Sequence, residues 1–350
     1  MASSCVGTLP TPTCRSSSNR AQPSRWRCSE TCCRRWSCRT GSSPSPRPDS
    51  MQADEAASHV SLWSGRQVRI SALSGGLTNE NYLVEVEGAR YVMRLPGQST
   101  ELLSIDRENE VYNTKAAATT GIGPQVLEHV AGLDVMVLEF IPGPTMSAQS
   151  LKAAEMPARM AQSFHRLHSA PRFLQDFNMF RLIESYLRIV EDHQVTIPSD
   201  YRKWLPAVRD IEGAVGLAAL PATPCHNDLL CENFIDDGTA LRIVDYELSG
   251  NNDPCFDLGN TAQEAEFGQE LRAALCEAYF GRRDPRQLAR MNLFALMSDV
   301  GWTLWGAIQA KISAVDFDFV GYYTGRWERA LRVLGSPDLR RWMTEAANLT

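Results

Sequence analysis

The chain has 350 residues, of which 43% are hydrophobic and 22% are charged, values typical of a globular protein with one large domain or two lobes. No apolar run approaches the ~18 residues that a membrane-spanning helix needs, so we expect a soluble, cytoplasmic protein without a membrane anchor. Residues 1–50 carry eight arginines against two acids, so the rest of the chain has a net charge of −12. This acidic body argues against nucleic acid as a partner, because nucleic-acid binding usually needs a basic face.

Residues 1–50 are rich in Ser, Pro, Arg and Cys and contain almost no aliphatic side chains. Such a composition cannot bury enough apolar surface to offset chain entropy, so we predict a disordered extension without a catalytic role. The cysteines between positions 28 and 38 lack the paired C-x2-C spacing of zinc sites, which disfavours a bound metal there.

The next part of the chain, residues 51–143, is predicted to form an N-terminal nucleotide-binding lobe. Short segments rich in β-branched and aromatic residues alternate with glycine turns, as expected for an antiparallel sheet. We predict strands at 67–73, 82–87, 90–95, 125–130 and 133–140, and one helix from 105 to about 120 that ends at Gly121 and Pro124.

Beyond Pro142-Gly143-Pro144 the pattern becomes mainly helical, and we predict a C-terminal catalytic and substrate-binding lobe over 144–350. The predicted helices are 147–169, 178–193, 200–216, 268–280, 286–311 and 316–334. They are interrupted by an island of loops and strands at 224–247. The predicted fold class is therefore α+β, with two lobes like those of a protein kinase: a sheet lobe with one helix and a larger helical lobe.

The segment of loops and strands at 224–247 contains the candidate catalytic and metal-binding residues. His226, Asp228 and Asn233 follow the spacing H-x-D-x4-N, and Asp245-Tyr246-Glu247 comes after the next predicted strand. Phosphoryl transfer needs a group that orients the acceptor hydroxyl and oxygen ligands for the metal ions that bridge the phosphates. We expect Asp228 to orient the hydroxyl, His226 to brace the loop, and the later residues to hold Mg²⁺: Asn233, Asp245 and Glu247. A plain Asp/Asn turn is the alternative, and the flanking apolar strands disfavour it.

A glycine-rich turn between the first two predicted strands is the candidate cover for the ATP phosphates. Glycines let backbone N–H groups approach phosphate oxygens closely, although Gly-Gly between strands is often only a turn. None of the four lysines follows a glycine in the G-x4-G-K pattern of a P-loop. The candidate nucleotide-binding residues of this loop are Ser74, Gly75, Gly76, Thr78 and Asn79.

The third predicted strand carries Arg94 where a kinase needs a cation, and the following helix offers Glu110 as its partner, with Glu108 as the competitor. A guanidinium can contact phosphates and a carboxylate together. Phe140 and Ile141, just before the Pro-Gly-Pro break, are expected to line the adenine pocket. The backbone of Glu139 to Ile141 would then bond the base edge.

With these residues in place, the chain resembles the choline/ethanolamine kinase family, within the wider aminoglycoside-phosphotransferase-like group, over roughly residues 70–330. The resemblance lies in Leu73–Tyr82, Tyr91–Gly97, His226–Asn233, Asp245-Tyr246-Glu247, Asp253–Asn260 and Gly301–Ser313.

The resemblance implies roles for residues outside the island. Asp257 would brace the catalytic loop, and three aromatic residues would enclose a quaternary ammonium: Trp302, Trp305 and Tyr322. Aromatic faces suit a trimethylammonium because it has no N–H to donate, although core packing is the commoner fate of tryptophans at this spacing. Glu264 is a possible acidic companion. Leu248 departs from the family pattern, since the animal enzymes have an aromatic residue there, so the acceptor site is looser or fits another amine.

The sequence therefore predicts an ATP- and Mg²⁺-dependent kinase, most simply a choline kinase that makes phosphocholine. A kinase for ethanolamine, an aminoglycoside or another small amine stays open. So does a catalytically silent nucleotide-binding protein of the same fold, which the intact Asp228, Asn233 and Asp245 disfavour. The sequence does not predict the oligomeric state.

Overall fold

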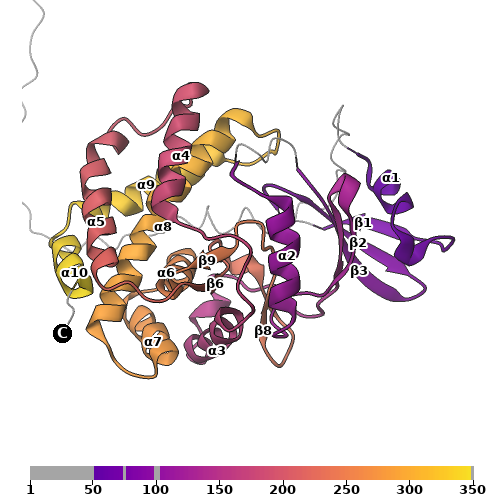
Figure 1. Ribbon diagram of the computed structural model, residues 1–350, viewed down its shortest axis with the longest axis horizontal. Helices are drawn as coiled ribbons and strands as arrows, with labels where there is room; N and C mark the ends of the chain where they lie inside the picture. Colours follow the sequence, from indigo (N-terminus) through magenta and orange to yellow (C-terminus); the bar gives the residue numbers. More distant parts are fainter. Residues whose placement is uncertain (1–50, 74–75, 98–102, 348–350) are drawn as a thin grey trace, which may run out of the picture. The chain divides into compact units, whose positions relative to one another are not determined.

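The computed structural model describes residues 51–73, 76–97 and 103–347 (Figure 1). The chain divides into two units, Met1–Pro48 and Asp49–Thr350, and the fold below is that of the second unit. The predicted extension at 1–50 and the loop residues Ser74 and Gly75 lie outside the described residues. No helix in the described part is both long enough and apolar enough to cross a membrane.

A five-stranded antiparallel sheet forms the N-terminal part of this unit. Its strand order is β1-β2-β3-β5-β4, so β3 is central and pairs with β2 on one side and β5 on the other. β-Branched and aromatic residues pack well on a pleated surface, which is why these segments form strands. The strands are β1 (Arg69–Ala72), β2 (Glu80–Val86), β3 (Ala89–Leu95), β4 (Val126–Val130) and β5 (Val135–Glu139), each within two residues of the prediction.

A segment before the sheet, which the sequence analysis left without an element, covers one face of it. The short helices α1 (Ala53–Ser58) and η2 (Ser61–Trp63) bury apolar side chains such as Val60 and Trp63 against β2, β3 and β5. The Glu128 carboxylate on β4 accepts the N–H groups of Ser61 and Leu62 at 2.8 Å each. The sheet therefore has its own small apolar core.

Helix α2 (Arg107–Ala118) lies between the sheet and the helical part of the chain (Figure 1). Asp106 caps it by accepting the Asn109 N–H at 3.0 Å. Its buried face is partly polar: Asn109 and Asn113 donate side-chain hydrogen bonds to the Ser249 carbonyl at 2.9 and 3.1 Å. These bonds attach α2 to the segment that follows Asp245-Tyr246-Glu247.

The link from the sheet to the helices runs along β7 (Phe234–Asp236). Met146 N–H donates to the Phe234 carbonyl at 2.8 Å, and Asp236 N–H donates to the Pro144 carbonyl at 3.0 Å. Gly143 has a φ of 144°, and a Cβ there would lie 2.0 Å from the Asp236 carbonyl oxygen. Only glycine fits at this close approach.

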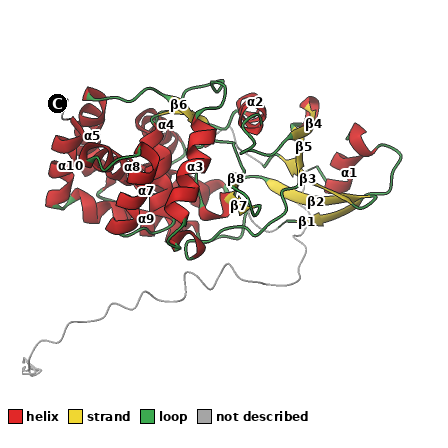
Figure 2. Ribbon diagram, turned by 90° about the horizontal axis from the view of Figure 1, so that it is seen from below, coloured by secondary structure: helices red, strands yellow, loops and turns green. Residues whose placement is uncertain are grey.

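The C-terminal part is mainly helical, and its described residues form two short antiparallel strand pairs (Figure 2). Its helices pack around α8, which is buried along most of its length. Asp284 caps α8 and Pro285 opens it, as expected at a helix start. The helices are α3 (Met156–His168), α4 (Met179–Asp192), α5 (Leu205–Leu217), α6 (Pro254–Glu264), α7 (Gln269–Phe280), α8 (Pro285–Ile312), α9 (Phe319–Leu334) and α10 (Pro337–Ala347). The strands are β6 (Thr223–Cys225), β7, β8 (Leu241–Ile243) and β9 (Gly250–Asn252).

The α+β fold class is confirmed, and the differences from the predicted elements are local. The predicted helix 147–169 is η5 (Ser150–Lys152) followed by α3, because Pro157 opens a new helix in its first turn. The predicted helix 200–216 divides in the same way into η6 (Tyr201–Trp204) and α5. Helices α6 and α10 were missed, although Asp253 and Pro254 form a recognisable start signal for α6. The division of the chain at residue 143 stays a proposal.

Gly143→Ala should destabilise the protein by about 2 kcal/mol, because alanine would be strained at this φ and its Cβ would overlap the β7 backbone. Urea unfolding followed by tryptophan fluorescence measures the change. Gly213→Ala is the control: Gly213 is an exposed position in α5 with open space around it, and alanine there should stabilise by up to about 1 kcal/mol. Equal effects of the two substitutions would contradict the close approach.

Candidate active site

The loop between β6 and β7 carries the first catalytic motif, and Asp257 on α6 fixes its backbone. One carboxylate oxygen of Asp257 accepts the His226 N–H and the other accepts the Asn227 N–H, both at 2.8 Å. Asp257 also lies 3.1 Å from His168 Nε2 on α3 and is fully buried. Asn227 has a φ of 68°, a left-handed conformation that asparagine tolerates better than most residues. The carboxylate therefore stabilises an unusual turn just before Asp228.

His226 is buried inside this loop, and both of its ring nitrogens have partners. Nε2 donates to the Val244 carbonyl at 2.9 Å, and Nδ1 accepts the Asp228 N–H at 3.3 Å. Burial lowers the pKa of His226, which favours the neutral ring that this arrangement needs. These contacts fit the expected bracing role.

Asp228 lies next in the loop, only partly covered. Asn233 donates from its side-chain amide to the Asp228 backbone carbonyl at 2.8 Å, which leaves the amide oxygen of Asn233 available to another ligand. Burial, together with the charges of Glu264 and Asp245, raises the pKa of Asp228 to about 7.

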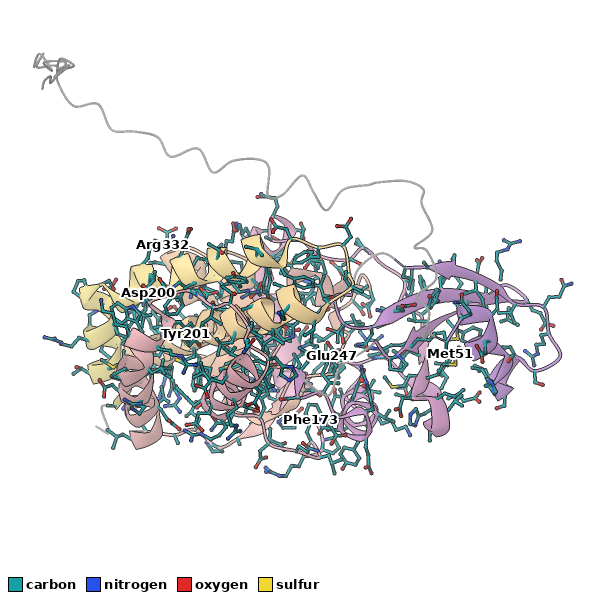
Figure 3. All side chains as sticks on the ribbon, turned by 90° about the horizontal axis from the view of Figure 1, so that it is seen from above. Met51, Phe173, Asp200, Tyr201, Glu247 and Arg332 are labelled. Atoms are coloured by element: carbon teal, nitrogen blue, oxygen red, sulfur yellow. The ribbon has the colours of Figure 1, made fainter. Side chains whose placement is uncertain are left out.

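Arg94 on β3 binds three carboxylates at once. Its Nη2 bonds the Asp245 carboxylate and lies 3.4 Å from Glu247, and its Nε lies 3.2 Å from Glu110 on α2. Arg94, Glu110 and Glu247 are each less than 8% exposed. Asp245 has a φ of 74°, so its backbone is in the left-handed region. Glu247 lies where the sheet part of the chain meets the helical part (Figure 3).

The charges in this cluster depend on one another. Burial by itself would lower the pKa of Arg94, but the three carboxylates outweigh it and raise the pKa above its ordinary value. Burial, helped by the charge of Asp245, raises the pKa of Glu247. Glu110 is the predicted partner, whereas the competing Glu108 is exposed and is not in this cluster.

A second arginine, which the sequence motifs did not predict, joins this cluster. Arg107, at the start of α2, donates from Nη1 to Glu110 at 2.6 Å and lies 3.7 Å from Glu247. Glu110 therefore bridges two guanidinium groups. The spacing of Arg107 and Glu110, three apart in a helix, is the signal that could have revealed the pair.

The described end of the glycine-rich loop joins this cluster. Asn79 donates from its side-chain amide to Glu247, and its own amide oxygen is buried without a hydrogen-bond partner. Gly97 lies so close that a Cβ there would be 1.6 Å from the Thr78 carbonyl oxygen. Gln309 on α8 donates to the Leu77 carbonyl at 3.4 Å. Gly76 has a φ of 94°, which suits glycine.

The predicted adenine-binding stretch follows β5. Ile141 is buried, and the Arg90 guanidinium lies 4.1 Å from the ring centre of Phe140. The Glu139 N–H already donates to the Gln125 carbonyl at 2.9 Å, and its carboxylate lies 3.2 Å from Arg242. The backbone N–H of Glu139 is therefore used within the sheet.

The predicted acceptor residues lie on α6, α8 and α9. Trp305 and Tyr322 form an edge-to-face pair with ring centres 5.6 Å apart, and Trp305 meets Phe319 in the same way at 6.0 Å. Trp302 is only 2% exposed and, among the described residues, forms no ring pair with either of them. Glu264 is bound to Arg326 at 2.7 Å. Trp302 and Trp305 both lie in the apolar core of the helical part, at 2% and 7% exposure, and of the two the structure joins Trp305 with Tyr322.

The oxygen donors around Asp245 fit a magnesium ion. Mg²⁺ prefers hard oxygen ligands. Asp245 and Glu247 supply carboxylates that both contact Arg94, and Asn79, whose amide nitrogen donates to Glu247, has a buried side-chain oxygen without a hydrogen-bond partner. The described part of the chain also brings together His168, Cys225 and Asp257. That cluster does not fit a metal: Asp257 already accepts two backbone N–H groups and has His168 Nε2 at 3.1 Å, and burial keeps the Cys225 thiol protonated by raising its pKa.

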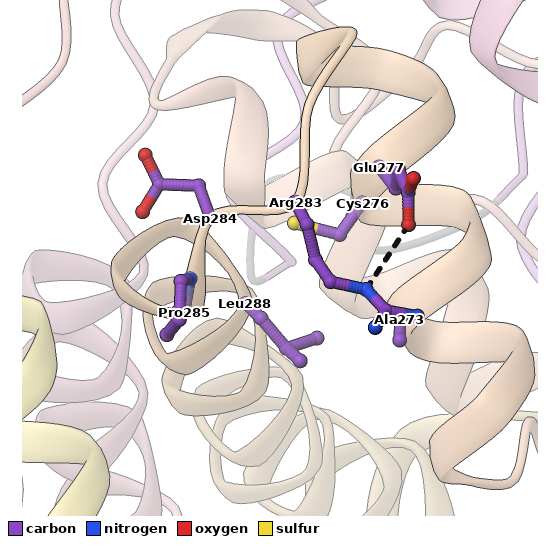
Figure 4. A pocket seen from close by; sticks show the side chains of 7 residues that line it. All are labelled: Ala273, Cys276, Glu277, Arg283, Asp284, Pro285 and Leu288. Atoms are coloured by element: carbon purple, nitrogen blue, oxygen red, sulfur yellow. Dashed lines mark ion pairs between the residues drawn. The ribbon is translucent and has the colours of Figure 1, made fainter.

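A pocket of about 270 Å³ lies elsewhere, between α7 and the start of α8 (Figure 4). It is lined mainly by apolar atoms, and the ion pair between Arg283 and Glu277, 3.4 Å apart, lies across it. None of the candidate residues lines it.

The sequence matches the choline/ethanolamine kinase family over residues 70–274, which is more than half of the chain. The chain belongs to this family. It is therefore a phosphotransferase that acts on an alcohol, and its two-part fold is that of a kinase. The matched range includes the catalytic loop, the Arg94 cluster and Asp257, and it ends before α8.

Similar proteins agree with this assignment. A choline/ethanolamine kinase family protein from Mesorhizobium loti is 33% identical and superimposes with a TM-score of 0.74, covering 85% of this chain and 99% of that one. Ethanolamine kinase 2 of Mus musculus is 29% identical and covers 77% of each chain. The choline kinase LicA from Streptococcus pneumoniae is 26% identical with a TM-score of 0.66, covering 76% of this chain and 93% of that one.

Asp257→Asn should lower kcat about 100-fold, because one of two backbone N–H groups loses its acceptor and Asp228 is no longer held in place. It should also destabilise the protein by about 2–3 kcal/mol. Turnover at a temperature where the variant is fully folded separates the two effects. Asp338→Asn, which removes an exposed ion pair with Arg341, is the control and should change neither. A folded Asp257→Asn variant with normal kcat would show that the brace is not needed.

Proposed function

We propose that this protein phosphorylates choline with ATP, producing phosphocholine and ADP. The observation that carries the proposal is the loop of Asp228, which Asp257 fixes through two backbone N–H groups, together with the buried cluster of Arg94, Asp245 and Glu247. The charges of Asp245 and of Glu264 both act on Asp228 and help to raise its pKa. Phosphoryl transfer needs a group that orients the acceptor oxygen near groups that bind the phosphates and the metal, with little covalent chemistry from the protein.

On the donor side, Arg94 would contact the phosphates while Glu110 holds its orientation. Asn233, Asp245 and Glu247 would hold Mg²⁺, which supplies charge neutralisation to the transferring phosphoryl group. Asp228 would accept a hydrogen bond from the acceptor hydroxyl and align it for attack. The backbone around Gly76 to Asn79 would cover the phosphates.

On the acceptor side, the arrangement of charges supports a quaternary ammonium. A primary ammonium donates three hydrogen bonds and needs acceptors for them, whereas a trimethylammonium donates none and is held by aromatic faces. Trp305 and Tyr322 offer such rings, with Phe319 beside them. The Glu264 carboxylate is already paired with Arg326. These contacts favour choline over ethanolamine.

Ethanolamine is the second candidate, because several similar proteins, such as that of Mus musculus, are ethanolamine kinases. Leu248, buried beside the second motif, replaces the aromatic residue that the animal enzymes have and leaves fewer ring faces.

A substrate panel decides between these acceptors. With saturating Mg²⁺–ATP, choline should give a kcat/KM at least about tenfold above that of ethanolamine, and an aminoglycoside should give none. A coupled assay for ADP measures the rates. Asp228→Asn should remove activity with every acceptor. Turnover of ethanolamine alone would reverse the choice of substrate, and no turnover with either would defeat the proposal.

Trp305→Leu should raise the KM for choline about tenfold, because it removes the ring face and keeps an apolar side chain. Trp305→Phe is the matched control: it keeps a ring and should raise the KM less than about threefold. The KM for ATP should stay the same in both. Equal effects of the two substitutions would show that Trp305 acts through packing.

The pH dependence follows from Asp228, whose raised pKa leaves it increasingly protonated below about pH 7. If the ionised form orients the hydroxyl, kcat/KM should fall with a slope of one as pH drops below that value.

The free energy of unfolding of the metal-free protein should change in the opposite direction, falling as pH rises. The neutral form is favoured by folding, so Asp228 should lower stability as pH rises from about 4 to about 7. Unfolding of wild type and Asp228→Asn across this range measures the difference, and parallel curves would contradict it.

A further inference from the structure

Arg326 on α9 is a buried cation that the sequence motifs did not reveal. Its side chain is 4% exposed. Nη1 lies 2.7 Å from the Glu264 carboxylate on α6 and 3.4 Å from the Asp299 carboxylate on α8. Arg326 therefore ties together the three helices that carry the acceptor residues.

The two carboxylates are not equally dependent on Arg326. Asp299 has a second arginine, because Arg329 bonds it through Nε at 3.1 Å and through Nη2, and Gln263 donates to it as well. Arg326 is the cation paired with Glu264 among the described residues. Removing Arg326 would leave Glu264 without its counter-charge, whereas Asp299 would keep Arg329.

Arg326 also occupies part of the aromatic surface. The centre of its guanidinium lies 4.4 Å from the ring centre of Tyr322, within the range of a cation–π contact. Tyr322 meets Trp305 edge to face on another side. Arg326 thus holds both the predicted acidic companion and one of the predicted aromatic residues.

We propose that Arg326 is a positioning residue that makes the acceptor site select a quaternary over a primary ammonium. It does so by holding Glu264 in an internal ion pair and by orienting Tyr322. A primary ammonium needs Glu264 as a hydrogen-bond acceptor, but a quaternary ammonium does not. This inference rests on the proposed function, and it assigns specificity to a residue that does not touch the substrate itself.

The test compares two arginines of the same helix. Arg326→Gln should raise the ratio of kcat/KM for ethanolamine to that for choline by about tenfold, mainly through a lower KM for ethanolamine, because Glu264 becomes available. Arg329→Gln, which alters only the pairing of Asp299, should keep the wild-type ratio. Equal ratios in the two variants would overturn the proposal.

Two further variants separate specificity from structural damage. Arg326→Lys keeps a positive charge beside Glu264 and should hold the ratio within about threefold of wild type. Combining Arg326→Gln with Glu264→Gln should return the ratio to wild type, because no free carboxylate remains. A double variant that keeps the altered ratio would show that Glu264 is not the group involved.

A measurement on the wild-type protein avoids the risk that Arg326→Gln fails to fold. Tetramethylammonium and ethylammonium have the two head groups without a hydroxyl and can be compared as competitive inhibitors against choline, or as ligands in calorimetry. Tetramethylammonium should bind at least about tenfold more tightly. Equal binding would overturn the inference even if choline is the substrate. Absence of turnover with both amino alcohols would instead defeat the proposed function.

Discussion

The structure depends on one buried cation. Arg94, on the central strand of the sheet, is surrounded by carboxylates from α2 and from the segment after β8. Buried charges are tolerated only when they are paired, and removing one partner leaves the others uncompensated at a cost of about 3–5 kcal/mol. The sheet, α2 and the segment that contains Asp245 and Glu247 are therefore held together by a single side chain. The groups that would bind phosphate and Mg²⁺ are the same groups that join the two parts of the fold.

A second buried group reverses the charges: a single carboxylate, that of Asp257, accepts several N–H donors. Asp257 on α6 fixes the backbone of the catalytic loop, while His226 spans from that loop to the Val244 carbonyl. The position of Asp228 is therefore set by hydrogen bonds to the backbone rather than by its own side chain. An acceptor hydroxyl bound there would meet a carboxylate whose position changes little.

The predicted acceptor residues on α6, α8 and α9 differ in the contacts they make within the protein. Trp302 and Trp305 lie one turn apart on α8 and are both buried in the core, yet of the two it is Trp305 that meets the Tyr322 ring. Glu264 is an acid in the expected place, but Arg326 already balances its charge. Under the proposed function, recognition of the amine would depend on which charges the protein has already paired internally.

The sequence by itself determined the fold class and the strands of the sheet, and it indicated the candidate catalytic residues, because these are encoded in short spacings: period-two strands, H-x-D-x4-N and the following carboxylates. It also indicated the pair of Arg94 and Glu110. Only the tertiary structure decided which charges meet across long stretches of chain, such as Arg326 with Glu264, and which of two buried tryptophans meets the Tyr322 ring. The physical reason is that ion pairs and ring contacts depend on distance in space, and neither the period of a helix nor the spacing of a motif specifies what its neighbouring helix presents.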